Sequence, residues 1–264
     1  MQQRIIDAHA HIFPEKIVRK AVVSIGDFYD IPMDGVGSSE DLLRSGGMIG
    51  VEKYIVHSVA TKPSQVVSIN SFIAQQMRLH PEFIGFATLH PYMDDLQAEV
   101  ERAEQLGLRG IKLHPDFQAF HIDEPRAMAL YRAIEGKLPL QIHMGDETRD
   151  FSEPVRLARV LDKFPDLTVI AAHFGGFSVW EDAKEYLVGR DVYFDTSSSL
   201  FKLPAQEAEQ IMHDHGMEKM LFGTDYPMWL HRQELERFMQ LRLTEQQRRM
   251  VLYDNAAKLL GVAD

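Results

Sequence analysis

The sequence predicts a single-domain α/β fold over residues 1–264, a (β/α)8 or TIM barrel, and three observations support this. The chain has 264 residues, close to the roughly 250 that one such barrel needs. Short apolar runs alternate with longer amphipathic stretches, as parallel strands alternate with covering helices. Polar residues also follow the apolar runs at roughly the length of one strand–helix unit, namely His57, His90, His114, His143, His173, Thr196 and Asp225.

Eight apolar runs are strand candidates, since each is short and rich in Val, Ile, Leu or Phe. In chain order they are "RIIDAHAHIF" from Arg4, "EKYIVHSVA" from Glu52, "FIGFATLHP" from Phe83, "RGIKLHP" from Arg109, "LPLQIHMG" from Leu138, "LTVIAAHFGG" from Leu167, "DVYFDTSS" from Asp191 and "KMLFGTDYP" from Lys219. Eight strands complete one barrel.

The segments between these runs carry apolar residues at helical spacing and recognisable end signals. Ser152 is a candidate N-cap, Gly107 and Gly216 are candidate helix stops, and Thr244 is expected to begin the last helix. Residues 14–50 are longer than one helix and contain the glycine-rich "DIPMDGVGSSED". We expect this insertion to be a loop with flanking helices that lies over the mouth of the barrel as a lid.

Composition limits the partners of the chain. Its formal net charge is −11, which argues against nucleic acid and anionic membranes, because both require clustered Lys and Arg. A small-molecule substrate is expected instead, and a homo-oligomer is compatible with the sequence. There is no cysteine, so a metal ion would need nitrogen and oxygen ligands. The N-terminus lacks an apolar signal-peptide core, so we expect a cytoplasmic protein.

The first strand carries an unusual His-x-His pair. Side chains two apart on a strand point to the same face, so Asp7, His9 and His11 are expected to lie on one side. Two imidazoles on one face can share a metal ion, although either could also be an ordinary buried histidine.

Three more metal-binding side chains stand where later strands end. Parallel barrel strands all end at one rim, so His143, His173 and Asp225 should converge on the His-x-His pair. A shared site explains their positions better than separate coincidences.

The chain resembles the amidohydrolase superfamily, in the amidohydrolase-related branch that also contains decarboxylases similar to aminocarboxymuconate semialdehyde decarboxylase. The matching stretches are "DAHAHIF", "GIKLHP", "QIHMG", "FPDLTVIAAHFGG", "FGTDYP" and "NAAKLLG". The resemblance implies that His9, His11, His143 and Asp225 hold a first divalent metal. It gives His173 a role on the substrate or as ligand to a second metal. Zn(II) is preferred because the site is rich in histidine, and one ion is favoured while two stay open.

The resemblance implies a metal-dependent hydrolase of a small amide, ester or lactone, which uses a water molecule that the metal activates. Asp225 would be the general base and then the general acid, and His173 would orient the water or polarise the scissile carbonyl. The alternative is a metal-dependent nonoxidative decarboxylase of a small aromatic or muconate-like carboxylate. A further alternative is a barrel that binds metal without catalysis.

Two residues of the fourth strand stay ambiguous. Lys112 is either carbamylated and bridges two metals, as in binuclear members of the superfamily, or forms an ion pair with Asp7 or Asp225. His114 either contacts the substrate or bonds to a loop.

Four other residues are candidates for the wall of the pocket. His57 and His90 end strands outside the ligand pattern, and a structural role is favoured for both. Arg149 and Arg232 lie in loops where a guanidinium could bind a substrate carboxylate, although most loop arginines are merely solvated.

Overall fold

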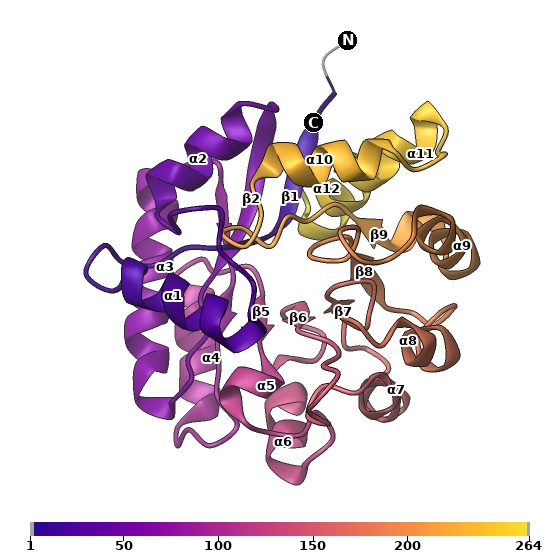
Figure 1. Cartoon of the computed structure of the whole chain (residues 1–264). Coiled ribbons are helices and arrows are strands. Elements are labelled where there is room, and N and C mark those ends of the chain that lie inside the picture. Colours follow the sequence, from indigo (N-terminus) through magenta and orange to yellow (C-terminus); the bar gives the residue numbers. More distant parts are fainter. Residues whose placement is uncertain (1–2, 263–264) are drawn as a thin grey trace.

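The computed structural model describes residues 3–262, and these form a closed barrel of parallel strands surrounded by helices (Figure 1). Within each of two sheets, β1 to β3 and β4 to β9, every strand pairs in parallel with its neighbour in the chain. The strands are β1 (Ile5–His11), β2 (Val51–His57), β3 (Phe83–Gly85), β4 (Ala87–Thr88), β5 (Ile111–Leu113), β6 (Leu140–Ile142), β7 (Val169–Ala171), β8 (Tyr193–Asp195) and β9 (Met220–Leu221). Each falls within a predicted run, except that β2 begins at Val51, one residue before its run.

The nine labelled strands make eight barrel strands, because β3 and β4 are one strand interrupted at Phe86. Phe86 N donates to Val56 O at 2.9 Å, which continues the hydrogen bonding from one sheet to the other. The barrel closes between β9 and β1, where Ala8 N donates to Phe222 O and Asp225 N donates to His9 O, both at 2.8 Å. The predicted (β/α)8 fold is confirmed.

Helices follow most of the strands. They are α1 (Val18–Tyr29), α2 (Ser39–Gly47), α3 (Val66–Leu79), α4 (Leu96–Gln105), α5 (Pro115–Gln118), α6 (Pro125–Ile134), α7 (Pro154–Lys163), α8 (Trp180–Tyr186), α9 (Ala205–His215), α10 (His231–Met239), α11 (Glu245–Arg249) and α12 (Asn255–Leu260), with 3₁₀ turns at Pro63–Gln65 and Met217–Lys219 and a π turn at Met250–Asp254. Thr244 caps α11 as predicted, because its side chain accepts from Gln247 N. The predicted cap at Ser152 is wrong: Glu153 precedes α7, and Ser152 Oγ donates to Asp116 at 2.6 Å.

Strand β1 is irregular, which changes the predicted orientation of Asp7. The register against β2 shifts between Asp7 and Ala10, and both Ile6 and Ala8 belong to the inner core cluster of the barrel. Asp7 therefore does not share a face with His9. Its carboxylate instead accepts from Thr224 N at 3.0 Å and Thr224 Oγ1 at 2.7 Å. A bulge of this kind re-aims side chains at a strand end.

The insertion at residues 14–50 contains α1 and α2 joined by a loop. Helix α1 contains no fully buried residue, so it rests on the barrel and adds little to the core. The loop is held by a chain of hydrogen bonds: Gly37 N donates to Tyr226 Oη at 2.9 Å, and Tyr226 Oη donates to Asp41 at 2.6 Å. This chain ties the insertion to the segment after β9.

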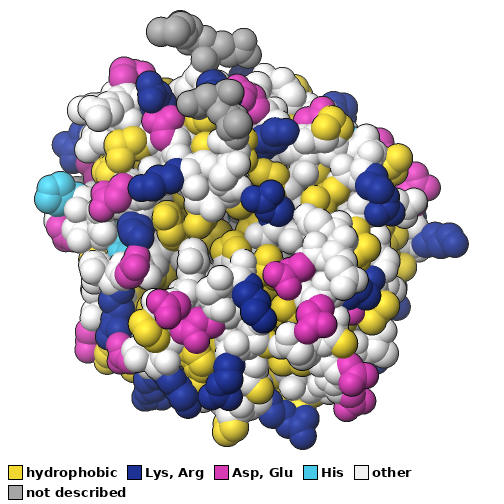
Figure 2. Space-filling model, turned by 180° about the vertical axis from the view of Figure 1, so that it is seen from behind, with side chains coloured by type: hydrophobic (Ala, Val, Ile, Leu, Met, Phe, Trp, Pro, Cys, Tyr) yellow, Lys and Arg dark blue, Asp and Glu magenta, His cyan; other side chains and the backbone are white. Residues whose placement is uncertain are grey.

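The face opposite to that of Figure 1 carries acidic and basic side chains that are interspersed, with apolar side chains between them (Figure 2). No helix among residues 3–262 has the length and apolar character needed to cross a membrane.

We predict that Asp41→Ala lowers the free energy of unfolding by about 1–3 kcal/mol, because Tyr226 Oη and Val36 N lose their acceptor. Burial alone would raise the pKa of Asp41, but its hydrogen bonds to Tyr226, Val36 and Arg44 outweigh burial and lower it. A lowered carboxyl pKa stabilises the fold above the unfolded value of about 3.8 and less as pH falls below it.

Urea titrations at several pH values should therefore show a difference between wild type and variant that is full at pH 6 and shrinks below about pH 4. Asp27→Ala, at an exposed position of α1, is the matched control and should stay within about 0.5 kcal/mol of wild type. An equal loss of unfolding free energy in both variants would show that the hydrogen bond from Tyr226 Oη to Asp41 does not stabilise the fold.

Candidate metal centre

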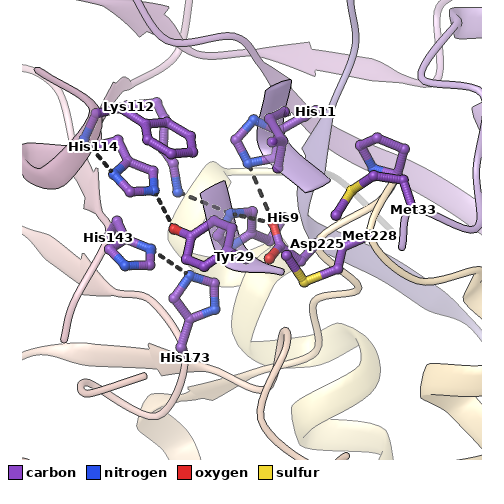
Figure 3. Close-up of a pocket in the computed structure, with 13 residues that line it drawn as sticks. His9, His11, Tyr29, Met33, Lys112, His114, His143, His173, Asp225 and Met228 are labelled. Carbon is purple, nitrogen blue, oxygen red and sulfur yellow. Dashed lines mark hydrogen bonds and ion pairs between the residues drawn. The ribbon is translucent and has the colours of Figure 1, made fainter. Parts of the chain in front are cut away.

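A cavity of about 350 Å³ opens at the carboxyl ends of the strands, where TIM-barrel active sites lie. All seven predicted site residues line it, and they share it with an apolar group from the insertion and from nearby loops (Figure 3). The lining residues are His9, His11, Ile25, Tyr29, Met33, Lys112, His114, Phe117, His143, His173, Asp225, Pro227 and Met228.

The His-x-His pair faces Asp225. Asp225 Oδ1 lies 3.4 Å from His9 Nε2 and 3.3 Å from His11 Nε2, so two ring nitrogens and one carboxylate oxygen converge. Asp225 has a positive φ of 58°, a conformation that is costly for a residue other than glycine. Its backbone N–H, which donates to His9 O at 2.8 Å, helps to hold it there.

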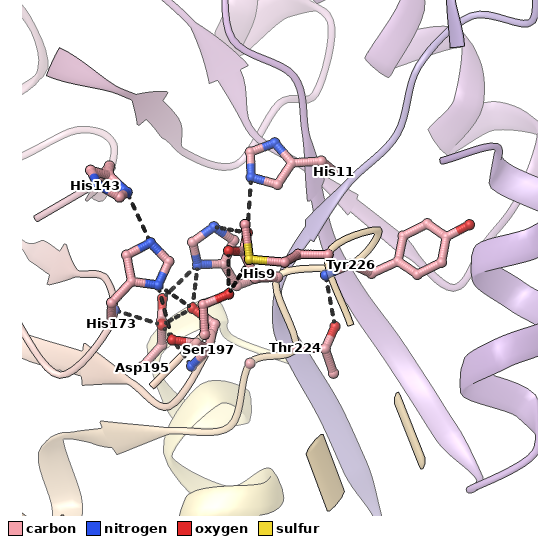
Figure 4. Close-up of polar contacts among 12 residues, drawn as sticks. His9, His11, His143, His173, Asp195, Ser197, Thr224 and Tyr226 are labelled. Carbon is pink, nitrogen blue, oxygen red and sulfur yellow. Dashed lines mark hydrogen bonds and ion pairs between the residues drawn. The ribbon is translucent and has the colours of Figure 1, made fainter. Parts of the chain in front are cut away.

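The other ring nitrogen of His9 is held by a network of polar groups below the cavity (Figure 4). Asp195 Oδ2 lies 3.0 Å from His9 Nδ1, and Gln141 Nε2 donates to the same oxygen at 3.0 Å. Asp195 Oδ1 accepts from His173 N at 3.1 Å and from Ser197 N at 3.2 Å. A carboxylate on Nδ1 leaves the Nε2 lone pair of His9 free for a metal.

Lys112 is fully buried and its Nζ lies 2.9 Å from His9 Nε2. Burial lowers the pKa of Lys112 to about 8, against the opposing effect of Asp195 and Asp225. Asp7, considered above as its partner, points to Thr224 instead. The Lys112 ammonium group is therefore mostly protonated at pH 7. It lies beside His9 Nε2, the nitrogen that is expected to bind metal, so a positive charge is tolerated next to this nitrogen.

His143 and His173 contact each other, with His143 Nδ1 2.9 Å from His173 Nε2. The remaining nitrogen of His143 lies 3.0 Å from Gly145 O. His173 Nδ1 lies 2.9 Å from Ser197 O, and His173 has a positive φ of 61°. The two rings therefore form one side of the cavity, opposite the His-x-His pair (Figure 3).

The roof of the cavity comes from the insertion. Tyr29 Oη lies 2.7 Å from His114 Nε2 (Figure 3), and the His114 ring stacks on His143 with centroids 3.9 Å apart. Burial raises the pKa of Tyr29 well above its usual value, so the phenol keeps its proton. His114 Nδ1 accepts from Phe117 N at 3.3 Å, so in the neutral ring Nε2 carries the hydrogen and donates to Tyr29 Oη. Ile25 and Met33 from the same segment add apolar surface over the site.

Burial lowers the pKa of His11 and of His173 to about 4 and that of His114 and His143 well below the usual value, so these four imidazoles are neutral at pH 7. For Asp225, burial alone would raise the pKa, but the neighbouring histidines lower it well below its usual value. Neutral imidazoles and an ionised carboxylate are the forms that bind a metal.

The donor chemistry therefore fits a divalent metal, for which nitrogen and oxygen ligands suit Zn(II) and several other ions. Within residues 3–262, three sets of side chains place one ligand atom each within 4.8 Å of the others. These sets are His9, His11 and His57; His9, His173 and Asp195; and His114, Asp116 and His143.

Sequence reasoning missed Tyr29, Asp195 and Ser197. Asp195 precedes Thr196 in "FDTSS", so a buried acid at the end of a strand was a usable signal. Tyr29 had none, because nothing in an insertion shows which side chain will reach the mouth.

The other candidates lie outside the cavity lining. Arg149 packs over the Phe28 ring, and Arg232 pairs with Glu236. His90 is buried away from the site, and its Nδ1 accepts from Tyr92 N. His57 is buried beside His9, against its ring.

The chain belongs to the amidohydrolase family, since a family model described as amidohydrolase matches residues 6–262. The predicted superfamily and branch are confirmed. Among solved structures, the chain is similar to 5-carboxyvanillate decarboxylase LigW from Sphingomonas paucimobilis, with 19% identity, a TM-score of 0.75 and coverage of 99% of this chain and 100% of that one.

Two further similarities are to decarboxylases. One is a dihydroxybenzoic acid decarboxylase from Polaromonas with bound manganese and 2-nitroresorcinol, with 18% identity, a TM-score of 0.77 and coverage of 98% of this chain and 97% of that one. The other is the decarboxylase orsB of Emericella nidulans, 28% identical over 127 residues. That alignment covers 40% of this chain and only 38% of the relative.

We predict that His9→Ala and His11→Ala each largely abolish binding of divalent metal, because both ring nitrogens converge on Asp225. Metal content of purified protein, measured by mass spectrometry, provides the test. His213→Ala, at an exposed position of α9, should keep the wild-type metal content. Full occupancy in the His9→Ala, His11→Ala double variant would refute the assignment.

Proposed function

We propose that the chain is a metal-dependent decarboxylase of a small carboxylated substrate, with an aromatic or muconate-like skeleton. The observation that carries the proposal is the cavity, which joins a floor of metal-binding groups to an apolar roof. The similarity to carboxyvanillate and dihydroxybenzoic acid decarboxylases supports it. Hydrolysis, the activity that the sequence put first, is supported only at the level of the family.

The lining of the cavity favours a small, flat substrate. Ile25, Met33, Phe117 and Met228 provide apolar contacts for a ring, and the histidines and Asp225 provide polar groups in the same cavity. Lys112 is the only Lys or Arg among the lining residues, which favours one substrate carboxylate over two.

A divalent metal held by His9, His11, Asp225 and a further histidine would bind anionic oxygens of the substrate and help to neutralise their charge. Loss of CO₂ leaves the bonding electron pair on the substrate carbon, and that carbon must take up a proton. We assign this transfer to Asp225, which is ionised at neutral pH. It would accept an acidic O–H proton of the substrate as the substrate binds and give it to the carbon as CO₂ leaves. His173 is the alternative donor.

The test uses metal-replete protein with a panel of hydroxybenzoates and muconate-like acids, and with a second panel of esters, lactones and amides. We expect CO₂ release from at least one acid, and in D₂O the product should carry one deuterium at the carbon that lost CO₂. Hydrolysis of a compound in the second panel without CO₂ release in the first would instead support a hydrolase. Inactivity in broad versions of both panels would favour the non-catalytic barrel.

Asp225→Asn should separate proton transfer from metal binding, because Asn keeps one oxygen but has lost the basic carboxylate. We expect turnover to fall by about 10²–10⁴ while part of the metal is retained. Asp150→Asn, at an exposed loop position, is the matched control and should turn over as wild type does. Wild-type turnover in a metal-replete Asp225→Asn enzyme would transfer the role to His173.

A further inference from the structure

His57 ends strand β2 and is fully buried, yet neither ring nitrogen has a hydrogen-bond partner within residues 3–262. Buried polar side chains are normally paired, and each exception needs an explanation. A neutral imidazole carries one N–H donor and one lone pair. Both are unpaired here, next to the candidate metal centre.

The position of His57 is that of a ligand. Its ring lies edge-on to both histidines of β1, with centroids 4.4 Å from His11 and 5.0 Å from His9. One nitrogen from each of the three rings lies within 4.8 Å of the other two. Nitrogens bound to one ion at about 2.1 Å can be no more than about 4.2 Å apart, so at most a small movement brings all three onto it.

Gln141 offers an acceptor for the other nitrogen of His57. Its side-chain amide N–H groups donate to Ala8 O at 2.9 Å and to Asp195 Oδ2 at 3.0 Å, which fixes the amide. Gln141 Oε1, like both nitrogens of His57, has no partner among the described residues. The His57 N–H would be directed at Gln141, as metal-bound histidines direct theirs at a supporting acceptor.

His143, which the family resemblance makes the third histidine ligand, has both nitrogens engaged. Nδ1 lies 2.9 Å from His173 Nε2, and Nε2 lies 3.0 Å from Gly145 O. Binding a metal through His143 would require one of these contacts to break. Binding through His57 would break none.

We propose that His57 is a ligand of the divalent ion that His9, His11 and Asp225 hold, and that Gln141 orients it. This inference rests on the metal centre proposed above but does not depend on the reaction. The simpler interpretation is a neutral buried histidine without a role. The two differ in metal affinity and ligand field, which can be measured without substrate.

The test compares His57→Gln and His57→Phe with wild type, using Co²⁺ as the probe. Circular dichroism and urea unfolding of the metal-free proteins check folding, and Phe fills the space of the ring without an unpaired nitrogen. We expect the Kd for Co²⁺, from competition with a chelator, to rise at least 100-fold in both variants. The visible absorption of bound Co²⁺ should weaken or shift, because a nitrogen ligand is lost.

His143→Gln makes the same substitution at the histidine that the family resemblance implies as a ligand, and its Kd for Co²⁺ is measured in the same way. Weaker Co²⁺ binding and a changed spectrum in a folded His57 variant support the proposal, whether or not His143→Gln also binds weakly. A Kd within about threefold of wild type and an unchanged spectrum in either folded His57 variant overturn it. Wild-type protein that binds no divalent ion would instead overturn the metal centre itself.

Discussion

The site depends on how Asp7 closes the barrel. One oxygen of its carboxylate accepts from His9 N and from Thr224 N, both at 3.0 Å, and so joins β1 to the segment after β9. The other oxygen lies 3.0 Å from His231 Nε2 on α10. Because Asp7 is turned outward by the bulge, His9 points into the barrel. The same segment carries Asp225, so one buried carboxylate sets the distance between the two groups that would bind metal.

The second constraint is the free-energy cost of burying many polar groups away from water. Burial holds the imidazoles of His11 and His173 neutral, which avoids the larger cost of burying charge. The carboxylates accept hydrogen bonds: Asp195 from Gln141 Nε2, His173 N and Ser197 N, and Asp225 from Ser198 Oγ. Lys112 provides positive charge in the same cavity. Such an arrangement is poorly suited to a purely structural core, since apolar residues would fill the space at lower cost, and it is well suited to holding a cation.

Sequence periodicity predicted the eight strands because each carries an apolar run long enough to be distinctive, and parallel strands must end at one rim. That rule brought His143, His173 and Asp225 together from distant positions. It could not show the bulge in β1, which depends on contacts with Thr224, or the reach of Tyr29 from an insertion with no regular pattern. It also gave no reason to single out His57, because a buried histidine becomes unusual only when its missing partners are seen.

Anomalous scattering from crystals of protein purified without chelators tests the central claim most directly. Data collected on both sides of the absorption edge of the copurifying metal locate the ion and its ligands. The account predicts one strong peak bounded by His9, His11 and Asp225, under the insertion. A protein that contains stoichiometric metal but shows its peak elsewhere, for example among the acidic side chains of residues 146–153, would contradict it.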